Sequence, residues 1–156
     1  LLRRTPAASD MRLVLAIFKT ITDLERIGDE TEKIARLVLN LNDPRAITTY
    51  YTGILAISKN VRRMLSDALN AFARMDSKSA IRIAQMDKEI DAGIDLLMRQ
   101  LITFTLEDVS VISAVLDAVL AARALERIGD HARNICENVI YLVDGIDVRH
   151  GETGIS

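Results

Sequence analysis

The sequence lacks tryptophan altogether, and it holds one cysteine, two prolines, seven glycines and few aromatic residues, which make up 4% of its 156 positions. Few turn-forming and aromatic residues, beside many leucines, isoleucines, alanines, arginines and aspartates, are typical of long helices rather than of strands and tight turns. The single cysteine, Cys136, excludes an internal disulfide, and a lone thiol suits a reducing compartment. We therefore expect an all-α protein of the cytoplasm.

Long uncharged apolar runs are also absent, and so is an excess of positive charge. The two most apolar stretches, residues 11–18 and 109–125, are interrupted by Arg12, Asp117 and Arg123, so neither predicts a membrane span. No signal peptide is visible. The formal net charge of −2 and the pI near 5.7 give no electrostatic attraction to a polyanion, so we expect no nucleic-acid partner.

What the sequence does contain is helical periodicity, with enough hydrophobic residues (49%) to bury one sizeable core. Apolar residues recur every three or four positions in four segments, which we expect to be helices over about 5–41, 46–75, 79–106 and 108–145. Asp108 is placed to cap the fourth helix, and Gly145 is placed to end it. In the first helix the spacing predicts one buried stripe, formed by Leu13, Ile17, Leu24, Ile27, Gly28, Thr31, Ile34, Ala35, Val38 and Leu41.

An internal repeat is the most informative pattern in the chain. The hexapeptide LERIGD occurs at residues 24–29 and again, unchanged, at residues 125–130, and the offset of 101 also brings Ile34 onto Ile135 and Val38 onto Val139. The first and fourth helices are therefore equivalent. We expect tandem three-helix bundles, truncated to the last helix of the first repeat (1–43) plus a complete second repeat (44–145), with a C-terminal tail at 146–156. The absence of an initiator methionine fits a natural N-terminus that lies upstream.

The repeated hexapeptide carries two carboxylates that share one helix face. Glu25 and Asp29 lie one turn apart, as do Glu126 and Asp130, and like charges at this spacing destabilise a helix by roughly 0.2–0.5 kcal/mol unless something offsets them. A bound cation would offset them, because hard and borderline metals take carboxylate oxygens. The third helix supplies further candidates with the same spacing, Asp87 and Asp91, and the fourth adds Asn134 and Glu137 on nearly the same side.

The alternative interpretation of these residues is structural. Acidic pairs at this spacing are common on solvated helix faces, and the repeated glycines, Gly28 and Gly129, favour close packing of a neighbouring helix rather than a ligand role. His131 is a secondary candidate at the edge of the site, although its counterpart in the first repeat is Glu30 and a surface histidine is the simpler interpretation. Arg26 and Arg127 are expected to form surface salt bridges.

At these residues the sequence resembles the PhoU family of phosphate uptake regulators. The resemblance is carried by LERIGDETEKIAR (24–36), LNAFARMD (69–76), MDKEID (86–91) and LERIGDHARNICE (125–137), and it covers nearly the whole chain. It implies two three-helix bundles in a cytoplasmic protein that often dimerises. The family's metal motif, an acidic residue followed four positions later by aspartate, maps onto Glu25 and Asp29, Asp87 and Asp91, and Glu126 and Asp130.

The resemblance also implies a function. Members of the family contact the ATPase-driven phosphate ABC transporter and the phosphate-sensing histidine kinase, and they restrain both when phosphate is plentiful. The chain is then a negative regulator of phosphate uptake and of the phosphate-starvation response, with contact to the membrane through its partners only. Iron, zinc, manganese and magnesium are all plausible occupants. Only the second-repeat site is complete within the chain, because the acidic partners expected opposite Glu25 and Asp29 are missing.

Two other functions compete with a metal-binding regulator. One is a metal-free structural bundle. The other is a di-metal carboxylate oxidase, which requires Glu followed three positions later by His on two helices. That position is Gly28 or Gly129 in this sequence, so we expect no enzyme activity.

Overall fold

The computed structural model describes residues 8–145, and this part of the chain is built of helices without a strand. The elements are α1 (Ala8–Leu39), α2 (Pro44–Tyr50), α3 (Thr52–Arg74), α4 (Ser77–Ala84), α5 (Met86–Glu107), the 3₁₀ turn η1 (Val109–Val111) and α6 (Ile112–Asp144). The all-α prediction is confirmed. The first residues of the helix expected over 5–41 and the tail expected at 146–156 lie outside the described residues.

Two of the four expected helices are broken in the structure. The second breaks at Tyr51, between α2 and α3, where a run of threonines and tyrosines forms helix poorly and Gly53 lets Leu97 approach to 2.7 Å from the position a Cβ would take. The third breaks at Gln85, between α4 and α5, without a glycine or proline to mark the point. The break at Gln85 creates a new helix N-terminus at Met86. Asp87 therefore lies in the first turn of α5, where backbone N–H groups favour negative charge.

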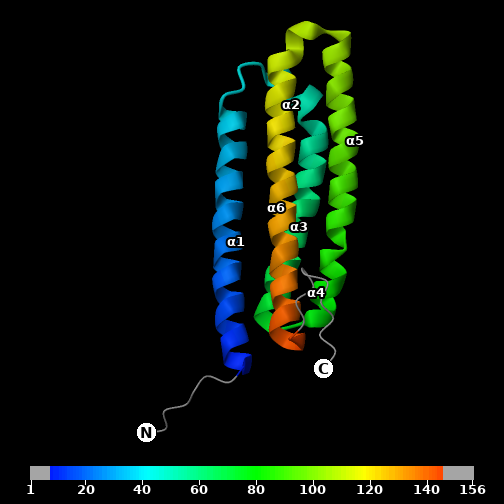
Figure 1. Cartoon of the computed structure of the whole chain (residues 1–156). Helices are drawn as coiled ribbons and strands as arrows, with labels where there is room; N and C mark the ends of the chain where they lie inside the picture. The colour runs from blue at the N-terminus through cyan, green and yellow to red at the C-terminus, as the bar shows by residue number, and fades with distance from the viewer. Residues whose placement is uncertain (1–7, 146–156) are drawn as a thin grey trace.

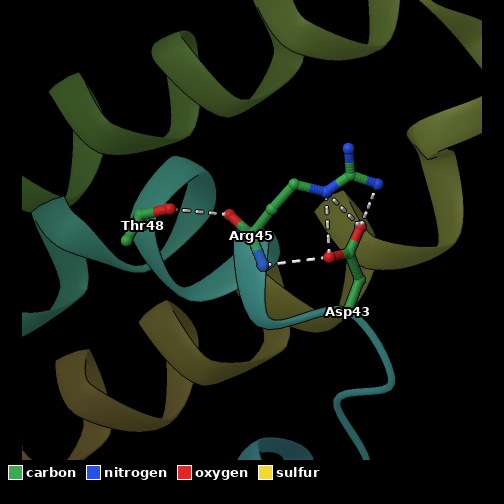
Figure 2. A network of polar contacts seen from close by, with 3 residues as sticks. All are labelled: Asp43, Arg45 and Thr48. Carbon is green, nitrogen blue, oxygen red and sulfur yellow. Dashed lines mark hydrogen bonds and ion pairs between the residues drawn. The ribbon is translucent and has the colours of Figure 1, made fainter.

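The start of α2 follows local side-chain chemistry. At the start of α2, Asp43 Oδ1 accepts a hydrogen bond from the Arg45 backbone N–H at 2.9 Å, and the Arg45 guanidinium folds back onto the same carboxylate (Figure 2). Pro44 occupies the first helical position, where a missing N–H costs nothing. The sequence predicts that Asp108 caps the fourth helix, but it caps the 3₁₀ turn η1 through its bond to the Ser110 N–H at 3.0 Å, and α6 begins at Ile112 without a side-chain cap. Gly145 ends α6, as predicted, with a φ of 69°.

The helices pack around α6, which contacts both sides of the molecule. On one side α3 and α5 run alongside α6, and the short α4 closes the lower end of this bundle (Figure 1). Its core is formed by Val61, Met64, Ile94, Leu101, Ile135 and Val139. On the other side α1 lies antiparallel to α6, held by contacts such as Lys19 over the Tyr141 ring and Glu30 with Arg127 at 3.6 Å.

The single buried stripe predicted for α1 is wrong, because α1 carries two apolar stripes. Ile27 and Ile34 face α6, whereas Ile17, Leu24, Gly28, Thr31, Ala35 and Val38 are exposed among the described residues. The repeat makes this difference clear: Leu24 is 40% exposed, and its counterpart Leu125 is 5% exposed under the bundle. The outer stripe of α1 thus matches the face of α6 that the bundle covers. No helix within residues 8–145 is long and apolar enough to cross a membrane.

Candidate metal centre

Three carboxylates converge where α5 meets α6. Asp87 and Asp91 come from α5, one turn apart, and Asp130 comes from the repeated hexapeptide on α6. One oxygen from each of the three lies within 4.8 Å of the others, and within residues 8–145 this is the group of acidic, histidine or cysteine side chains close enough to hold a metal ion. The structure therefore brings together three of the residues that sequence reasoning selected, and we call them the acidic cluster.

Burial distinguishes the acidic cluster from an ordinary acidic helix face. Asp87 is 3% exposed, and Asp91 and Asp130 are half-buried. Asp87 Oδ1 and Asp91 Oδ1 are shielded from solvent and accept no hydrogen bond within the described chain. A buried carboxylate oxygen without a donor is costly, because it has lost its water and gained nothing in return.

The electrostatics of the acidic cluster favour either a proton or a cation. Burial, followed by the charges of Asp87, Asp130 and Glu126, raises the pKa of Asp91 from 3.8 to about 6. Burial and the neighbouring Asp87 also raise the pKa of Asp130. Neighbouring carboxylates with raised pKa values, such as Asp91 and Asp130, are typical of functional sites. A bound cation would relieve the repulsion between their negative charges.

Gly129 gives Asp87 an open approach to α6. A Cβ at Gly129 would lie 3.6 Å from Asp87 Oδ1 and 3.6 Å from Ile90. These are ordinary contact distances, so a methyl group would fit there, but it would contact the unpaired oxygen of Asp87. The predicted close approach of a neighbouring helix holds at this glycine. At Gly28 a Cβ would meet nothing within 4 Å among the described residues, so the same prediction fails there.

The other acidic candidates on α6 lie at the rim of the acidic cluster. Glu126 accepts from Arg123 at 3.1 and 3.2 Å, yet it is near enough to raise the pKa of both Asp91 and Asp130. Glu137 lies 3.7 Å from Nε of Arg133. Arg133 is the residue that sequence reasoning missed: its Nη1 donates to Asp87 Oδ2, and the spacing of three positions from Asp130 is the signal that places it on this face.

Two secondary candidates, His131 and Asn134, do not face the acidic cluster. They are directed to α1 on the adjacent face of α6, where His131 Nδ1 lies 3.0 Å and Asn134 Nδ2 lies 3.2 Å from Asp23 Oδ1. Asn138 completes this network from the same side, with bonds to Asp23 Oδ2 at 3.3 Å and to Thr20 at 3.2 Å. The sequence prediction that Asn134 shares the side of Glu137 is therefore wrong, and Asp23 and Asn138 are polar core residues that it overlooked.

Glu25 and Asp29 are exposed on α1 and do not approach the acidic cluster. Asp29 lines a shallow groove on α1 together with Glu30 and four other charged side chains of the same helix. The expected salt bridge of Arg127 is present, directed across the interface to Glu30.

The fold and the site define a class: a helical bundle in which an acidic motif that occurs twice in the sequence faces, from α6, a second acidic pair on α5. The PhoU domain family matches residues 1–38 and 54–139, and the chain belongs to that family, as its motifs predict. It is 52% identical over 150 residues to the phosphate-specific transport system accessory protein PhoU homolog of Pseudomonas putida, covering 96% of this chain and 59% of that protein. It is 44% identical over 148 residues to the PhoU accessory protein of Escherichia coli K12, covering 95% of this chain and 61% of that protein.

Solved structures agree with the fold. The crystal structure of PhoU from Pseudomonas aeruginosa superposes with a TM-score of 0.85 at 48% identity, over 92% of this chain and 69% of that one. The phosphate transport system regulatory protein PhoU from Streptococcus pneumoniae gives 0.77 at 32% identity, over 90% of this chain and 66% of that one. The chain spans about three fifths of the length of the curated relatives it matches.

Proposed function

We propose that this chain is part of a negative regulator of phosphate uptake and of the response to phosphate starvation. The support is family membership, because relatives that match 95–96% of the chain are named phosphate-specific transport system accessory proteins. In this proposal the protein works in the cytoplasm as a homodimeric adaptor between the ATPase of the phosphate ABC transporter and the phosphate-sensing histidine kinase. It has no turnover of its own and reaches the membrane only through these partners.

Within that role, we propose that the acidic cluster holds a multivalent cation. The observation that carries this proposal is the pair of buried, unpaired oxygens, Asp87 Oδ1 and Asp91 Oδ1, which a cation would supply with the partner they lack. Asp87, Asp91 and Asp130 would be the ligands, with Glu126 and Glu137 at the rim. An all-carboxylate donor set fits magnesium, manganese, iron or zinc, and the cation would stiffen the contact between α5 and α6.

Elemental analysis tests the cation directly. Protein purified without chelator is compared with an Asp91→Ala, Asp130→Ala double variant, and we expect metal in the first and its loss in the second. The metal-free structural bundle remains the competing hypothesis, because Arg133 already neutralises part of the acidic charge. Equal and negligible metal in both proteins would support that hypothesis and exclude the proposed cation.

The oxidase alternative receives no support from the positions of the histidine and glycine on α6. The residue three positions after Glu126 is Gly129, and the nearest histidine in sequence, His131, is directed to Asp23 on α1. A ferritin-like centre needs imidazole ligands at such positions. Oxygen consumption by iron-loaded protein would revive this alternative, and we expect none.

The regulatory role is tested in cells. A strain without the gene is expected to express phosphate-scavenging genes even in high phosphate, and the intact gene is expected to restore repression. The same gene carrying Asp91→Asn and Asp130→Asn then shows whether repression needs the acidic cluster. Normal repression in the deletion strain would contradict the regulatory role, whatever the cluster binds.

We further propose that α1 closes a first three-helix unit, as α6 closes the second. The support is the repeat itself: the exposed positions Leu24 and Val38 correspond to Leu125 and Val139, which the bundle covers. In this arrangement Glu25 and Asp29 form half of a second acidic site. A cysteine placed at Leu24 of the full gene product would be protected from maleimide labelling, and rapid labelling of the native protein would argue against a covering unit.

A further inference from the structure

Arg133 lies in the acidic cluster as an internal cation. Its Nη1 donates to Asp87 Oδ2, and its Nε lies 3.7 Å from Glu137 Oε1 on the same helix, one turn further along. The Asp87 side chain is 4% exposed, whereas the Arg133 side chain is 40% exposed. The guanidinium therefore enters the acidic cluster from the solvent side and contacts its most deeply buried carboxylate.

The surrounding charges explain why a cation is retained there. Burial opposes the charge of Arg133, but Asp87, Asp130 and Glu137 outweigh it and raise the pKa of the guanidinium further. Arg123, the other arginine at this site, is engaged with Glu126 at the rim. Among the described residues, Arg133 is thus the cation in direct contact with one of the three clustered aspartates.

We propose that Arg133 is a built-in counter-ion that competes with the multivalent cation and so sets the affinity of the site. This inference rests on the proposed function, in which the acidic cluster holds a cation. When the site is empty, the guanidinium neutralises Asp87. When a cation enters, the guanidinium leaves Asp87 for Glu137, which already lies within ion-pair reach of its Nε.

The geometry favours competition over a positioning role. A guanidinium on one oxygen of Asp87 draws electron density from the carboxylate and places a positive charge beside any incoming cation, and both effects weaken coordination. Its exposed approach and its second acceptor allow it to move without being stranded in the core. A pure anchor would instead hold Asp87 in place for the metal, and its removal would weaken binding. Removal of the Arg133 guanidinium should therefore raise the affinity for metal if Arg133 is a competitor and lower it if Arg133 is an anchor.

The test is isothermal titration calorimetry of chelator-stripped protein with Mn²⁺ at pH 7.5. For Arg133→Gln we expect binding about tenfold tighter than for the wild type, because a charge-assisted hydrogen bond to Asp87 no longer has to be broken. Arg133→Lys keeps the charge and is expected to bind like the wild type. Arg127→Gln is the matched control, since it removes the same kind of side chain from a position of α6 that faces Glu30 of α1 instead.

The remaining outcomes separate this inference from the proposal beneath it. Wild-type binding that disappears in Asp91→Asn, Asp130→Asn establishes the site, and equal or weaker binding by Arg133→Gln then overturns the competitor while the site stands. Binding by Arg133→Lys as tight as by Arg133→Gln would show that charge is not the cause and would also overturn it. No binding by any of the proteins refutes the site and the inference together. Circular dichroism checks that each variant remains helical, and the chelator-stripped Arg133→Gln variant should melt below the wild type and recover with Mn²⁺.

Discussion

Replacing Asp91 by asparagine should stabilise the metal-free protein at neutral pH, although it removes a charged residue from a polar site. Asp91 has a pKa of about 6 against an ordinary 3.8, because burial and the charges of Asp87, Asp130 and Glu126 disfavour its ionised form. The folded state therefore holds the Asp91 proton more tightly than the unfolded state does. Asparagine resembles the protonated acid and cannot acquire the unfavourable charge.

The sign and the size of the stability change follow from the difference between the folded and unfolded pKa values of Asp91. An acid whose pKa is raised by folding contributes stability that is fully present below pH 3.8 and is lost as the pH rises through about 6. The difference between these pKa values corresponds to about 3 kcal/mol for a fully buried group. Solvent screening at a half-buried position reduces it to roughly 1–2 kcal/mol. For a chain of this length, that is an increase in Tm of about 2–8 °C for Asp91→Asn at pH 7.5.

The assay is thermal unfolding followed by circular dichroism from pH 4 to 8 in the presence of EDTA. The gap between Asp91→Asn and the wild type should be absent near pH 4, widen as the pH rises to about 6, and stay constant above it, because the two states bind different numbers of protons only between the two pKa values. Asp95→Asn is the matched control, because Asp95 lies one turn further along α5 and is exposed. A variant that is less stable than the wild type at pH 7.5, or as stable, would refute the electrostatic argument. With Mn²⁺ in place of EDTA the order should reverse, since only the wild type keeps all three clustered aspartates.

Three further predictions concern the rest of the molecule. Asp23→Ala should lower the free energy of unfolding in urea by roughly 2–4 kcal/mol, because three buried or half-buried donors on α6 lose their acceptor. Asp29→Ala, on the exposed face of α1, should lower it by under about 0.5 kcal/mol, and equal losses would contradict the prediction. Cys136 is fully buried and burial raises its pKa to about 12, so Ellman's reagent should modify it only in denaturant, and rapid reaction of the native protein would disagree. Met64→Ala should cost about 2–5 kcal/mol, since Met64 is fully buried, whereas Met11→Ala, half exposed, should be nearly neutral in the same experiment.

The fold was largely predictable because its helices follow the apolar period closely. The end of α6 at Gly145 carries a familiar signal, and the structure uses it. The breaks at Tyr51 and Gln85 were not predicted, because the apolar pattern continues through both and neither position is glycine or proline. A break of this kind depends on how the neighbouring helices pack, and a single sequence does not record that.

The prediction of a single buried stripe on α1 failed for a different reason. Periodicity identifies apolar positions but not what covers them, and α1 has apolar positions on two faces. Ile27 and Ile34 pack on α6, while Leu24 and Val38 repeat a buried face of α6 without a cover among the described residues. The identical hexapeptides therefore have different environments: Asp130 joins a buried group of carboxylates, and Asp29 is solvated.

The site was predicted in part because helix spacing groups residues by face, and the errors come from neighbours in sequence that lie on different faces. On α6 the positions directed to the acidic cluster and its rim are Glu126, Asp130, Arg133 and Glu137, and those directed to α1 are Arg127, His131, Asn134 and Asn138. Each member of the second set follows a member of the first by one residue, which is about 100° around the helix. A motif that covers 125–137 therefore contains two polar faces with separate partners. His131 and Asn134 have the chemistry of metal ligands, but both lie about 100° around the helix from the acidic cluster and contact Asp23 instead. Arg133, which no metal motif would include, lies on the face of the acidic cluster.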